Sequence, residues 1–361
     1  MAEKKYVFSF KEAHAAKLGK DILGGKGFGL AEMTAAGVNI PQGFTISTEA
    51  CNLYYASGKK IPDVVWNDIV EHIHEIERES GKKFGGGGAM PLLVSVRSGA
   101  RQSMPGMMDT ILNLGTNDVT VKELAEAAGN ERFAWDSYRR FLLMFTNIAK
   151  GHPRTDMDKM LDDLKAENGY KLDTEVTVEQ LKGLVAKYKA YYKSVFNEDF
   201  PQDPYVQLKE AVAAVFRSWD NERANIYRQM NGIPYEWGTA VNVQTMVFGN
   251  MGEDSGTGVA FSRSPSTGEK GIYAEFLPNA QAKTSSLASA RRSTSTSSLA
   301  ACPTSTVNSP KPSRAWNTTS MICRTWSTPS KKANSTSSRP AMASAPPALL
   351  SRSPATSSTK A

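Results

Sequence analysis

Cysteine is scarce in this sequence. Among its 361 residues only 3 are cysteines, Cys51, Cys302 and Cys323. They provide no even-numbered disulfide framework, and their spacing matches no paired zinc-ligand motif. The cysteine content therefore argues against a disulfide-stabilised secreted protein and against a structural zinc site, and it favours a cytoplasmic location.

Long apolar runs are also missing. No stretch approaches the roughly 20 apolar residues that a membrane-spanning helix needs, and the first residues are mixed in character rather than an apolar targeting segment. We therefore expect no membrane partner. The histidines follow no pattern typical of a nucleophile or a metal site and are expected to be structural or exposed: His14, His72, His74 and His152.

Carboxylates are absent from the C-terminal part of the sequence. Residues 282–361 contain 11 Lys or Arg and no Asp or Glu, and 33 of these 80 residues are Ser or Thr. Residues 1–281 carry 32 basic and 36 acidic side chains, a net charge of −4, so the overall charge of +7 comes from the tail. No nucleic-acid partner is therefore expected for the folded part. The composition of 282–361 predicts disorder.

Residues 1–281 have the patterns of a folded protein. Short apolar runs at 91–96 and 241–248 are suited to buried strands. A glycine-containing turn at 249–258 leads into a further apolar run at 259–261. Strands are thus expected toward both ends of this part of the chain.

A helical block is predicted between these strands. Helices are expected at about 131–149, 156–168, 177–195 and 203–230, where apolar residues recur at helical intervals. Two residue pairs have the spacing of a capping box, Thr120 with Glu123 and Thr177 with Gln180. The order of the elements indicates an α+β domain over 1–281 with a helical insertion at about 117–232.

Glycines surround a lysine near the N-terminus, in Leu23-Gly-Gly-Lys26-Gly-Phe-Gly29. Glycines let backbone amides approach phosphate oxygens, the start of a helix carries partial positive charge, and Lys26 supplies a cation for a terminal phosphate. The motif is not a Walker A loop, because Gly27 rather than Ser or Thr follows the lysine. A plain glycine turn before a helix is the alternative.

Residues 95–109 leave the first predicted strand with two arginines, Arg97 and Arg101. The planar guanidinium group suits phosphate oxygens, and Gly106 after a proline can shape a loop that closes over a nucleotide. The stretch therefore predicts a phosphate-binding loop. The alternative is a surface ion pair, with the methionines of this loop as ordinary core.

The second predicted strand and the turn after it offer further contacts. The strand at 241–248 and the turn at 254–258 are suited to enclose an adenine and to touch its phosphates, and a plain core hairpin explains them equally well. The arginines on predicted helices are expected on solvated or ion-paired faces: Arg139, Arg140, Arg217, Arg223 and Arg228.

Several separate motifs of the sequence resemble those of one protein family. They are Gly24-Gly-Lys26-Gly with Leu30-Ala-Glu-Met33, Ile40-Pro-Gln-Gly-Phe-Thr45, residues 95–115, Phe216-Arg-Ser-Trp-Asp-Asn221, Trp237-Gly-Thr-Ala-Val-Asn242, residues 255–261 and Gly268-Glu-Lys-Gly-Ile-Tyr273. All are similar to the N-terminal nucleotide-binding domain of pyruvate, phosphate dikinase, which is of ATP-grasp type. The resemblance runs from about Tyr6 to Gln281. Related phosphoenolpyruvate synthases share part of it, whereas residues 99–110 look like the dikinase version.

The resemblance implies a domain that binds ATP with Mg²⁺ and sends the β-phosphoryl group to a histidine on a separate domain. Phosphate takes the γ-phosphoryl group to give pyrophosphate, and the phosphohistidine then phosphorylates pyruvate in a barrel-shaped domain. Family members are commonly homodimers. The ATP-site residues implied by motif position are Lys26, Arg97, Arg101, Gly106, Gln244, Thr257 and Glu275. Lys26 and Arg97 are the implied catalytic cations.

The sequence departs from the family in its C-terminal part. No stretch resembles the Thr-Ser-His phosphohistidine loop, and a pyruvate-binding barrel is not expected in this length. The family continues after Gln281 with Gly-Glu-Asp-Val-Val-Ala. Codons for these residues, read one base later, give Ala-Lys-Thr-Ser-Ser-Leu, the sequence at 282–287, and a second such match covers 333–342. We therefore hypothesise a one-base frameshift near codon 281.

A frameshift would remove groups that the family uses. The metal-linked Asp and Glu would have been encoded where Thr325 and Ser327 stand, and a nucleotide-site Gln where Arg339 stands. Mg²⁺ needs hard oxygen ligands, so we expect no metal ligand in this chain, no final strands of the nucleotide site, weak ATP binding or none, and no catalysis. The alternative is a stand-alone nucleotide-binding or regulatory module whose basic tail binds an acidic partner or RNA.

Overall fold

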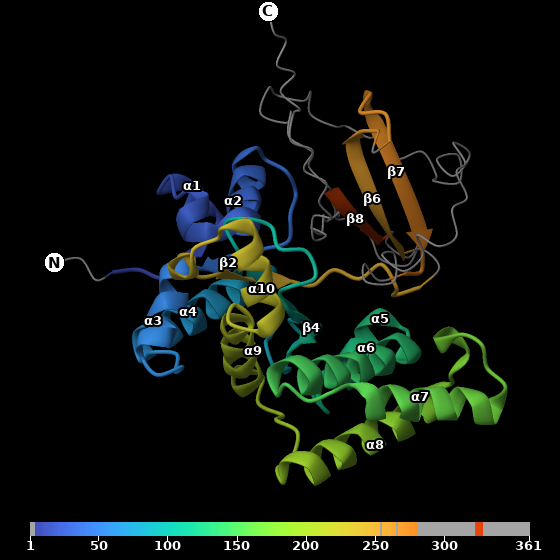
Figure 1. Ribbon diagram of the computed structural model, residues 1–361. Helices are drawn as coiled ribbons and strands as arrows, with labels where there is room; N and C mark the ends of the chain where they lie inside the picture. Colours follow the sequence, from blue (N-terminus) through green and yellow to red (C-terminus); the bar gives the residue numbers. More distant parts are fainter. Residues whose placement is uncertain (1–3, 253–254, 265, 281–321, 328–361) are drawn as a thin grey trace, which may run out of the picture.

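The computed structural model of the chain describes residues 4–252, 255–264, 266–280 and 322–327. In this part of the chain helices combine with two antiparallel sheets, which agrees with the expected α+β class (Figure 1). The larger sheet has the strand order β1-β2-β5-β3-β4. The bounds are Val7–Ser9 for β1, Gly43–Ile46 for β2, Val94–Gly99 for β3, Thr110–Leu114 for β4 and Ala240–Thr245 for β5.

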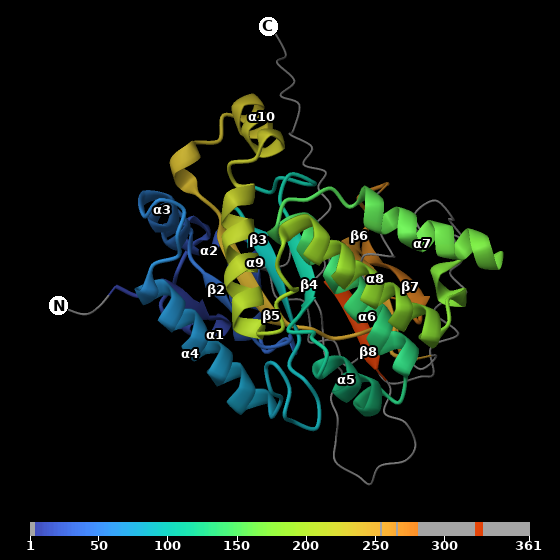
Figure 2. The same cartoon turned by 90° about the horizontal axis from the view of Figure 1, so that it is seen from below.

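One face of the five-stranded sheet is apolar. Side chains alternate between the two faces along a strand, and this face carries Val96 of β3 with Val241 and Val243 of β5, all fully buried. Figure 2 shows α4 (Asp63–Ser80) and α9 (Pro204–Ser218) lying across the strands on this side. Their buried apolar residues join the valines in one hydrophobic core.

The opposite face of the same sheet is polar and is covered by α2 (Lys20–Ala35). The register places Arg97 opposite Asn242, and Asn242 opposite Thr45. A Cβ atom at Gly27 of α2 would lie 2.7 Å from the Thr45 hydroxyl oxygen and 2.9 Å from Asn242 Oδ1. Glycine at this position therefore lets α2 lie directly on the polar side chains.

Helices fill the sequence between β4 and β5. They are α5 (Thr120–Ala128), α6 (Glu131–Met144) with a π-helical extension (Phe145–Ala149), α7 (Thr155–Asn168), α8 (Val178–Phe196), α9 and α10 (Glu222–Asn231). The helix expected at 203–230 is two helices, because Asn221 caps α10 by accepting a hydrogen bond from Ala224 N at 2.7 Å. Before β3 lie α1 (Phe10–Ala15) and α3 (Thr48–Ala56) in addition to α2 and α4. In the described segments no helix has the length and apolar character of a membrane span.

One of the two predicted capping boxes is confirmed. Thr177 and Gln180 exchange the two hydrogen bonds of the box at the start of α8. The prediction for Thr120 and Glu123 is wrong. The Thr120 amide donates to Asn117 Oδ1 at 2.8 Å, and the Glu123 carboxylate instead accepts from Gly87 N at 2.7 Å. The N-cap residue of α5 is Val119, and Asn117, two residues before it, accepts from the Thr120 amide in place of a capping box.

The second sheet has the order β7-β6-β8, with β6 at Ser255–Arg263, β7 at Lys270–Pro278 and β8 at Ile322–Ser327. Thr257 therefore lies in a strand and not in the predicted turn. The prediction of disorder throughout 282–361, without further strands, is wrong for β8, since its β-branched and aromatic residues favour a strand beside the edge of β6. The other residues of 282–361 lie outside the described residues.

Candidate functional site

Lys26 follows a sharp kink in α2. Gly24 has φ 66° and ψ 173°, and a Cβ atom there would lie 1.4 Å from the carbonyl oxygen of Gly99. Gly25 N donates to the carbonyl oxygen of Ala100 at 2.9 Å. Only glycine fits this contact. The predicted glycine turn thus lies inside the helix, and it brings the first turns of α2 against the end of β3.

Two cations meet at this contact. Lys26 Nζ donates to the carbonyl oxygen of Ser98 at 2.8 Å, and the neighbouring Arg97 is 8% exposed. The pKa of Lys26 falls to about 7, first because burial disfavours the charged ammonium and second because the Arg97 charge repels it. An anion bound here would relieve both effects. The structure therefore brings together the two residues that were predicted to contact phosphate.

Gln244 shares the polar face with Arg97. It lies opposite Ser95 in the register and is 3% exposed, and its Nε2 donates to the carbonyl oxygen of Pro41 at 3.1 Å. Asn242 lies on the same face and was not selected from the sequence. The signal was present, because polar residues alternate with valines along this strand.

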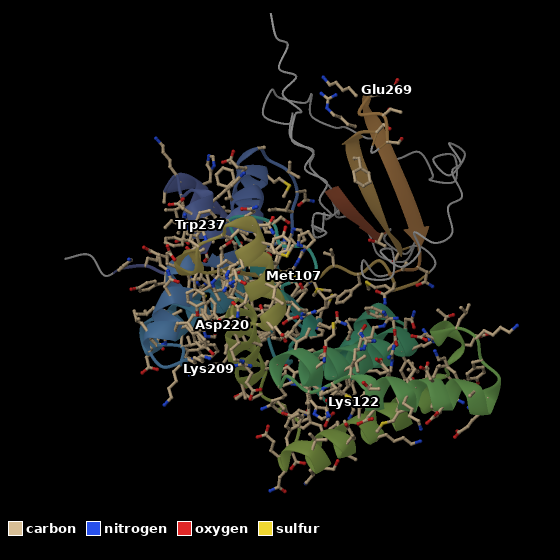
Figure 3. All side chains as sticks on the ribbon, in the orientation of Figure 1. Met107, Lys122, Lys209, Asp220, Trp237 and Glu269 are labelled. Atoms are coloured by element: carbon tan, nitrogen blue, oxygen red, sulfur yellow. The ribbon has the colours of Figure 1, made fainter. Side chains whose placement is uncertain are left out.

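The predicted phosphate loop continues from β3. Arg97 belongs to the strand itself, whereas Arg101 lies in the loop, with its guanidinium carbon 5.0 Å from the centre of the Trp237 ring. Gly106 is exposed and has φ 75°, a conformation that favours glycine. Met104 is 6% exposed, so the reading of the loop methionines as core holds for this residue. Met107 and Trp237 lie on either side of α10 in Figure 3.

Two predicted residues lie on the other sheet. Thr257 of β6 is 1% exposed, and Glu275 of β7 is opposite Val259 in the register. In both Figure 1 and Figure 2 this sheet stands to one side of the five-stranded sheet. The structure therefore places Lys26, Arg97 and Gln244 together and carries Thr257 and Glu275 on a separate sheet.

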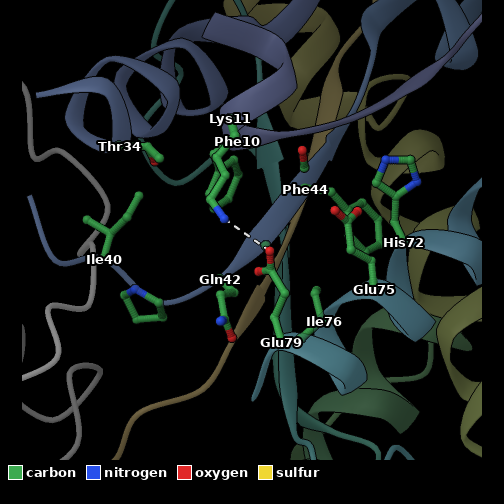
Figure 4. Close-up of a pocket in the computed structure, with 13 residues that line it drawn as sticks. Phe10, Lys11, Thr34, Ile40, Gln42, Phe44, His72, Glu75, Ile76 and Glu79 are labelled. Carbon is green, nitrogen blue, oxygen red and sulfur yellow. Dashed lines mark hydrogen bonds and ion pairs between the residues drawn. The ribbon is translucent and has the colours of Figure 1, made fainter. Parts of the chain in front are cut away.

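The described residues contain no group of three or more His, Cys, Asp or Glu arranged to hold a metal ion. Figure 4 shows a pocket of about 90 Å³ beside α1, β2 and α4, lined in part by Phe10, Phe44 and Ile76, with a 3.0 Å ion pair between Lys11 and Glu79. None of the predicted site residues lines it.

Comparison with known proteins decides the family. A family model described as the pyruvate phosphate dikinase AMP/ATP-binding domain matches residues 20–64 and 55–276. The chain belongs to this family. All the predicted site residues, from Lys26 to Glu275, lie within the matched segments of this pyruvate phosphate dikinase domain.

Individual relatives agree with the domain assignment. The chain is 59% identical to pyruvate, phosphate dikinase of Clostridium symbiosum over 278 residues, which are 77% of this chain and 32% of the relative. It is 54% identical to the chloroplastic enzyme of Oryza sativa subsp. japonica over 280 residues, 77% of this chain and 29% of the relative. For Rhizobium meliloti (strain 1021) the identity is 50% over 281 residues, 78% and 31% of the two chains. The match thus covers about a third of each relative.

Proposed function

We propose that this chain supplies the ATP-binding part of a pyruvate, phosphate dikinase. In the proposed reaction ATP, phosphate and pyruvate give AMP, pyrophosphate and phosphoenolpyruvate, with the β-phosphoryl group carried on a histidine of another domain. The observation that carries the proposal is the pair of Lys26 and Arg97, set against glycines at the end of β3. Cations and amide donors that neutralise phosphate charge provide most of the catalysis in phosphoryl transfer.

The proposed roles follow from position. Lys26 and Arg97 would hold phosphate oxygens, with Arg101 and Gly106 on the loop beside them, and Gln244 would support the same face of the sheet. Thr257 and Glu275 would face the nucleotide from the second sheet, as expected for an ATP-grasp arrangement. An ATP phosphate suits this site, because burial and the Arg97 charge lower the pKa of Lys26 to about 7 and a bound anion would favour the charged ammonium.

The described residues contain no group of three or more His, Cys, Asp or Glu that could hold a metal ion by themselves. Mg²⁺ usually takes only one or two carboxylates together with substrate phosphates. We therefore assign no step to the metal. The phosphohistidine and pyruvate-binding domains, the homodimer and a cytoplasmic location are parts of the proposal that rest on family resemblance and composition.

A chimaera tests the proposed function. Residues 1–280 would replace the matching segment of the Clostridium symbiosum enzyme, which then supplies the rest of its own chain. We expect this chimaera to transfer label from [β-³²P]ATP to phosphoenolpyruvate and from [γ-³²P]ATP to pyrophosphate. The same chimaera with Lys26→Met should lose both transfers. A folded chimaera that releases no phosphoenolpyruvate would contradict the proposal.

For the chain as written we propose weak ATP binding or none, and no catalysis, caused by a one-base frameshift near codon 281. Tight binding of ATP with Mg²⁺ in calorimetry would contradict the first statement. Resequencing the coding DNA tests the second, because inserting one base there should restore a continuation with carboxylates. If it does not, the alternative of a nucleotide-binding module with a basic interaction tail is favoured.

A further inference from the structure

The loop that carries Gly106 is held from one side by α10. Asn221, the residue that caps this helix, also donates from Nδ2 to the carbonyl oxygen of Met107 at 3.2 Å. The hydroxyl group of Tyr227 donates to the carbonyl oxygen of Ser103 at 3.4 Å. Side chains of the α10 segment therefore bind the backbone of the loop on both sides of Gly106.

Further contacts extend this attachment. Arg223 precedes Tyr227 by four residues and so lies on the same helix face, and its Nη2 is 3.7 Å from Asp109 Oδ1. The loop residue Met104 packs in a small buried cluster with Ala224 of α10 and with Trp219. The loop itself is an irregular turn, so its position depends on what holds it.

A buried arginine fixes α10 to the rest of the protein. Arg228 is 5% exposed, and its guanidinium carbon lies 4.4 Å from the centre of the Trp219 ring and 5.0 Å from that of Tyr235. Its nitrogens donate to the carbonyl oxygen of Trp219 and to Asn225 Oδ1. Trp219 Nε1 in turn donates to the carbonyl oxygen of Tyr235 at 2.9 Å. The guanidinium group thus joins α10, the end of α9 and the segment before β5.

We propose that α10 is the positioning element of the loop at residues 103–109, and that Arg228 is the residue that holds α10 in place. The inference rests on the proposed function, in which Gly106 contacts ATP phosphates. A loop held in its binding conformation loses less conformational entropy when a nucleotide binds. Arg228 acts on the nucleotide only through α10 and is a positioning residue.

Hydrogen exchange of the full chain, followed by mass spectrometry with and without ATP, tests the proposal. Asn221→Ser keeps a good N-cap residue, but the serine is too short to reach Met107. We expect amides of residues 103–109 to exchange about fivefold faster, as the loss of one hydrogen bond predicts. Amides of α10 and the Tm should stay as in the wild type. The ATP concentration that protects the loop should rise by a similar factor.

Arg228→Lys tests the anchor, because lysine keeps the charge and loses the planar stacking on Trp219 and Tyr235. Exchange should accelerate both in α10 and in residues 103–109. The control is Met230→Ala, on the same helix but 80% exposed, which should change neither segment. If Arg228→Lys loosens α10 while the loop keeps wild-type exchange, the proposal is overturned.

The outcomes also separate this proposal from the proposed function. A folded chimaera that releases no phosphoenolpyruvate speaks against the proposed function, whereas exchange of the loop amides in the Asn221→Ser chain without ATP still reports whether α10 holds the loop. Unchanged loop exchange in Asn221→Ser overturns the positioning role even if ATP binds. Faster loop exchange together with a weaker ATP effect supports both.

Discussion

The ammonium nitrogen of Lys26 lies 2.8 Å from the carbonyl oxygen of Ser98. A carbonyl group accepts the hydrogen bond but does not neutralise the positive charge. Since burial disfavours the charged ammonium and Arg97 adds a second positive charge beside it, the pKa of Lys26 falls to about 7. This contact between α2 and β3 therefore stores unfavourable electrostatic energy that a bound anion would release.

The pKa of Lys26 can be measured from its reactivity. Only a neutral amine reacts with acetic anhydride. The rate at which Lys26 is labelled should therefore level off just above pH 7, whereas an unperturbed lysine has a pKa of about 10.4. Adding ATP should move the Lys26 inflection to higher pH, because bound phosphate stabilises the ammonium form. Mass spectrometry of the labelled peptide gives both curves. An inflection near that of surface lysines would contradict the assignment.

The lowered pKa of Lys26 should also make the stability of the chain depend on pH. The pKa of Lys26 is about 7 in the folded chain and 10.5 when unperturbed, so the folded state binds fewer protons between these values. The free energy of unfolding contributed by Lys26 should then rise across this window, by at most about 1.4 kcal/mol per pH unit. Urea unfolding at several pH values should show this slope. Lys26→Met should remove it and raise stability at pH 7.

Replacing either of two glycines of α2 by alanine should change the stability of the chain, in opposite directions for the two positions. Gly24→Ala puts a Cβ atom into the carbonyl oxygen of Gly99, at φ 66°, and should destabilise the chain by about 3 kcal/mol or more. Gly29 has no atom within 4 Å of its Cβ position. Gly29→Ala should therefore stabilise the helix by about 0.5–1 kcal/mol. Urea midpoints compare the two variants, and a tolerated Gly24→Ala would refute the close approach of α2 to β3.

The buried His72 should make stability depend on pH. Burial opposes its charged form, but hydrogen bonds to Asp68 and Glu12 outweigh burial and raise its pKa above 6.5. Its contribution is complete below pH 6.5 and is lost as the pH rises through the folded-state pKa. His72→Gln should flatten the fall in stability that begins above pH 6.5. Urea unfolding of the wild type and of His72→Gln at several pH values measures this fall.

Replacing a buried carboxylate among the helices between β4 and β5 should lower the stability of the chain more than replacing an exposed one. Asp136 is 4% exposed and accepts hydrogen bonds from Arg139 at 2.7 Å and Arg140 at 2.7 Å. Asp136→Asn would leave buried arginine charge without its counter-ion and should cost about 3–5 kcal/mol. The control is Asp163→Asn, whose pair with Lys159 is exposed and is worth at most about 1 kcal/mol. Guanidinium unfolding curves distinguish the two.

Local patterns allowed much of the fold to be predicted from the sequence. The box of Thr177 and Gln180 marks the start of α8, because both of its hydrogen bonds join residues three apart. The break between α9 and α10 was missed, although Asn221 is a good N-cap residue. Apolar periodicity continues across the break and concealed it.

Tertiary contacts limit how much of the candidate site can be predicted from the sequence. Lys26 and Arg97 were both proposed from the sequence, but their proximity depends on Gly24 fitting against Gly99, which no local pattern reveals. Arg228 was expected on a solvated or ion-paired face and is buried between two aromatic rings. Its partner Tyr235 lies beyond the end of α10, so helical spacing alone gave no sign of the stacking.

The central position of β5 has a consequence for synthesis. This strand lies between β2 and β3, although about 140 residues separate it from β3 in the sequence. While the ribosome is still making the helical insertion, β2 and β3 therefore have no common neighbour, and their inner edges stay unpaired. Lys26 and Arg97 can take up their final positions only after residue 245 has emerged. A nascent chain that stalls earlier leaves these edges open to aggregation or to a chaperone.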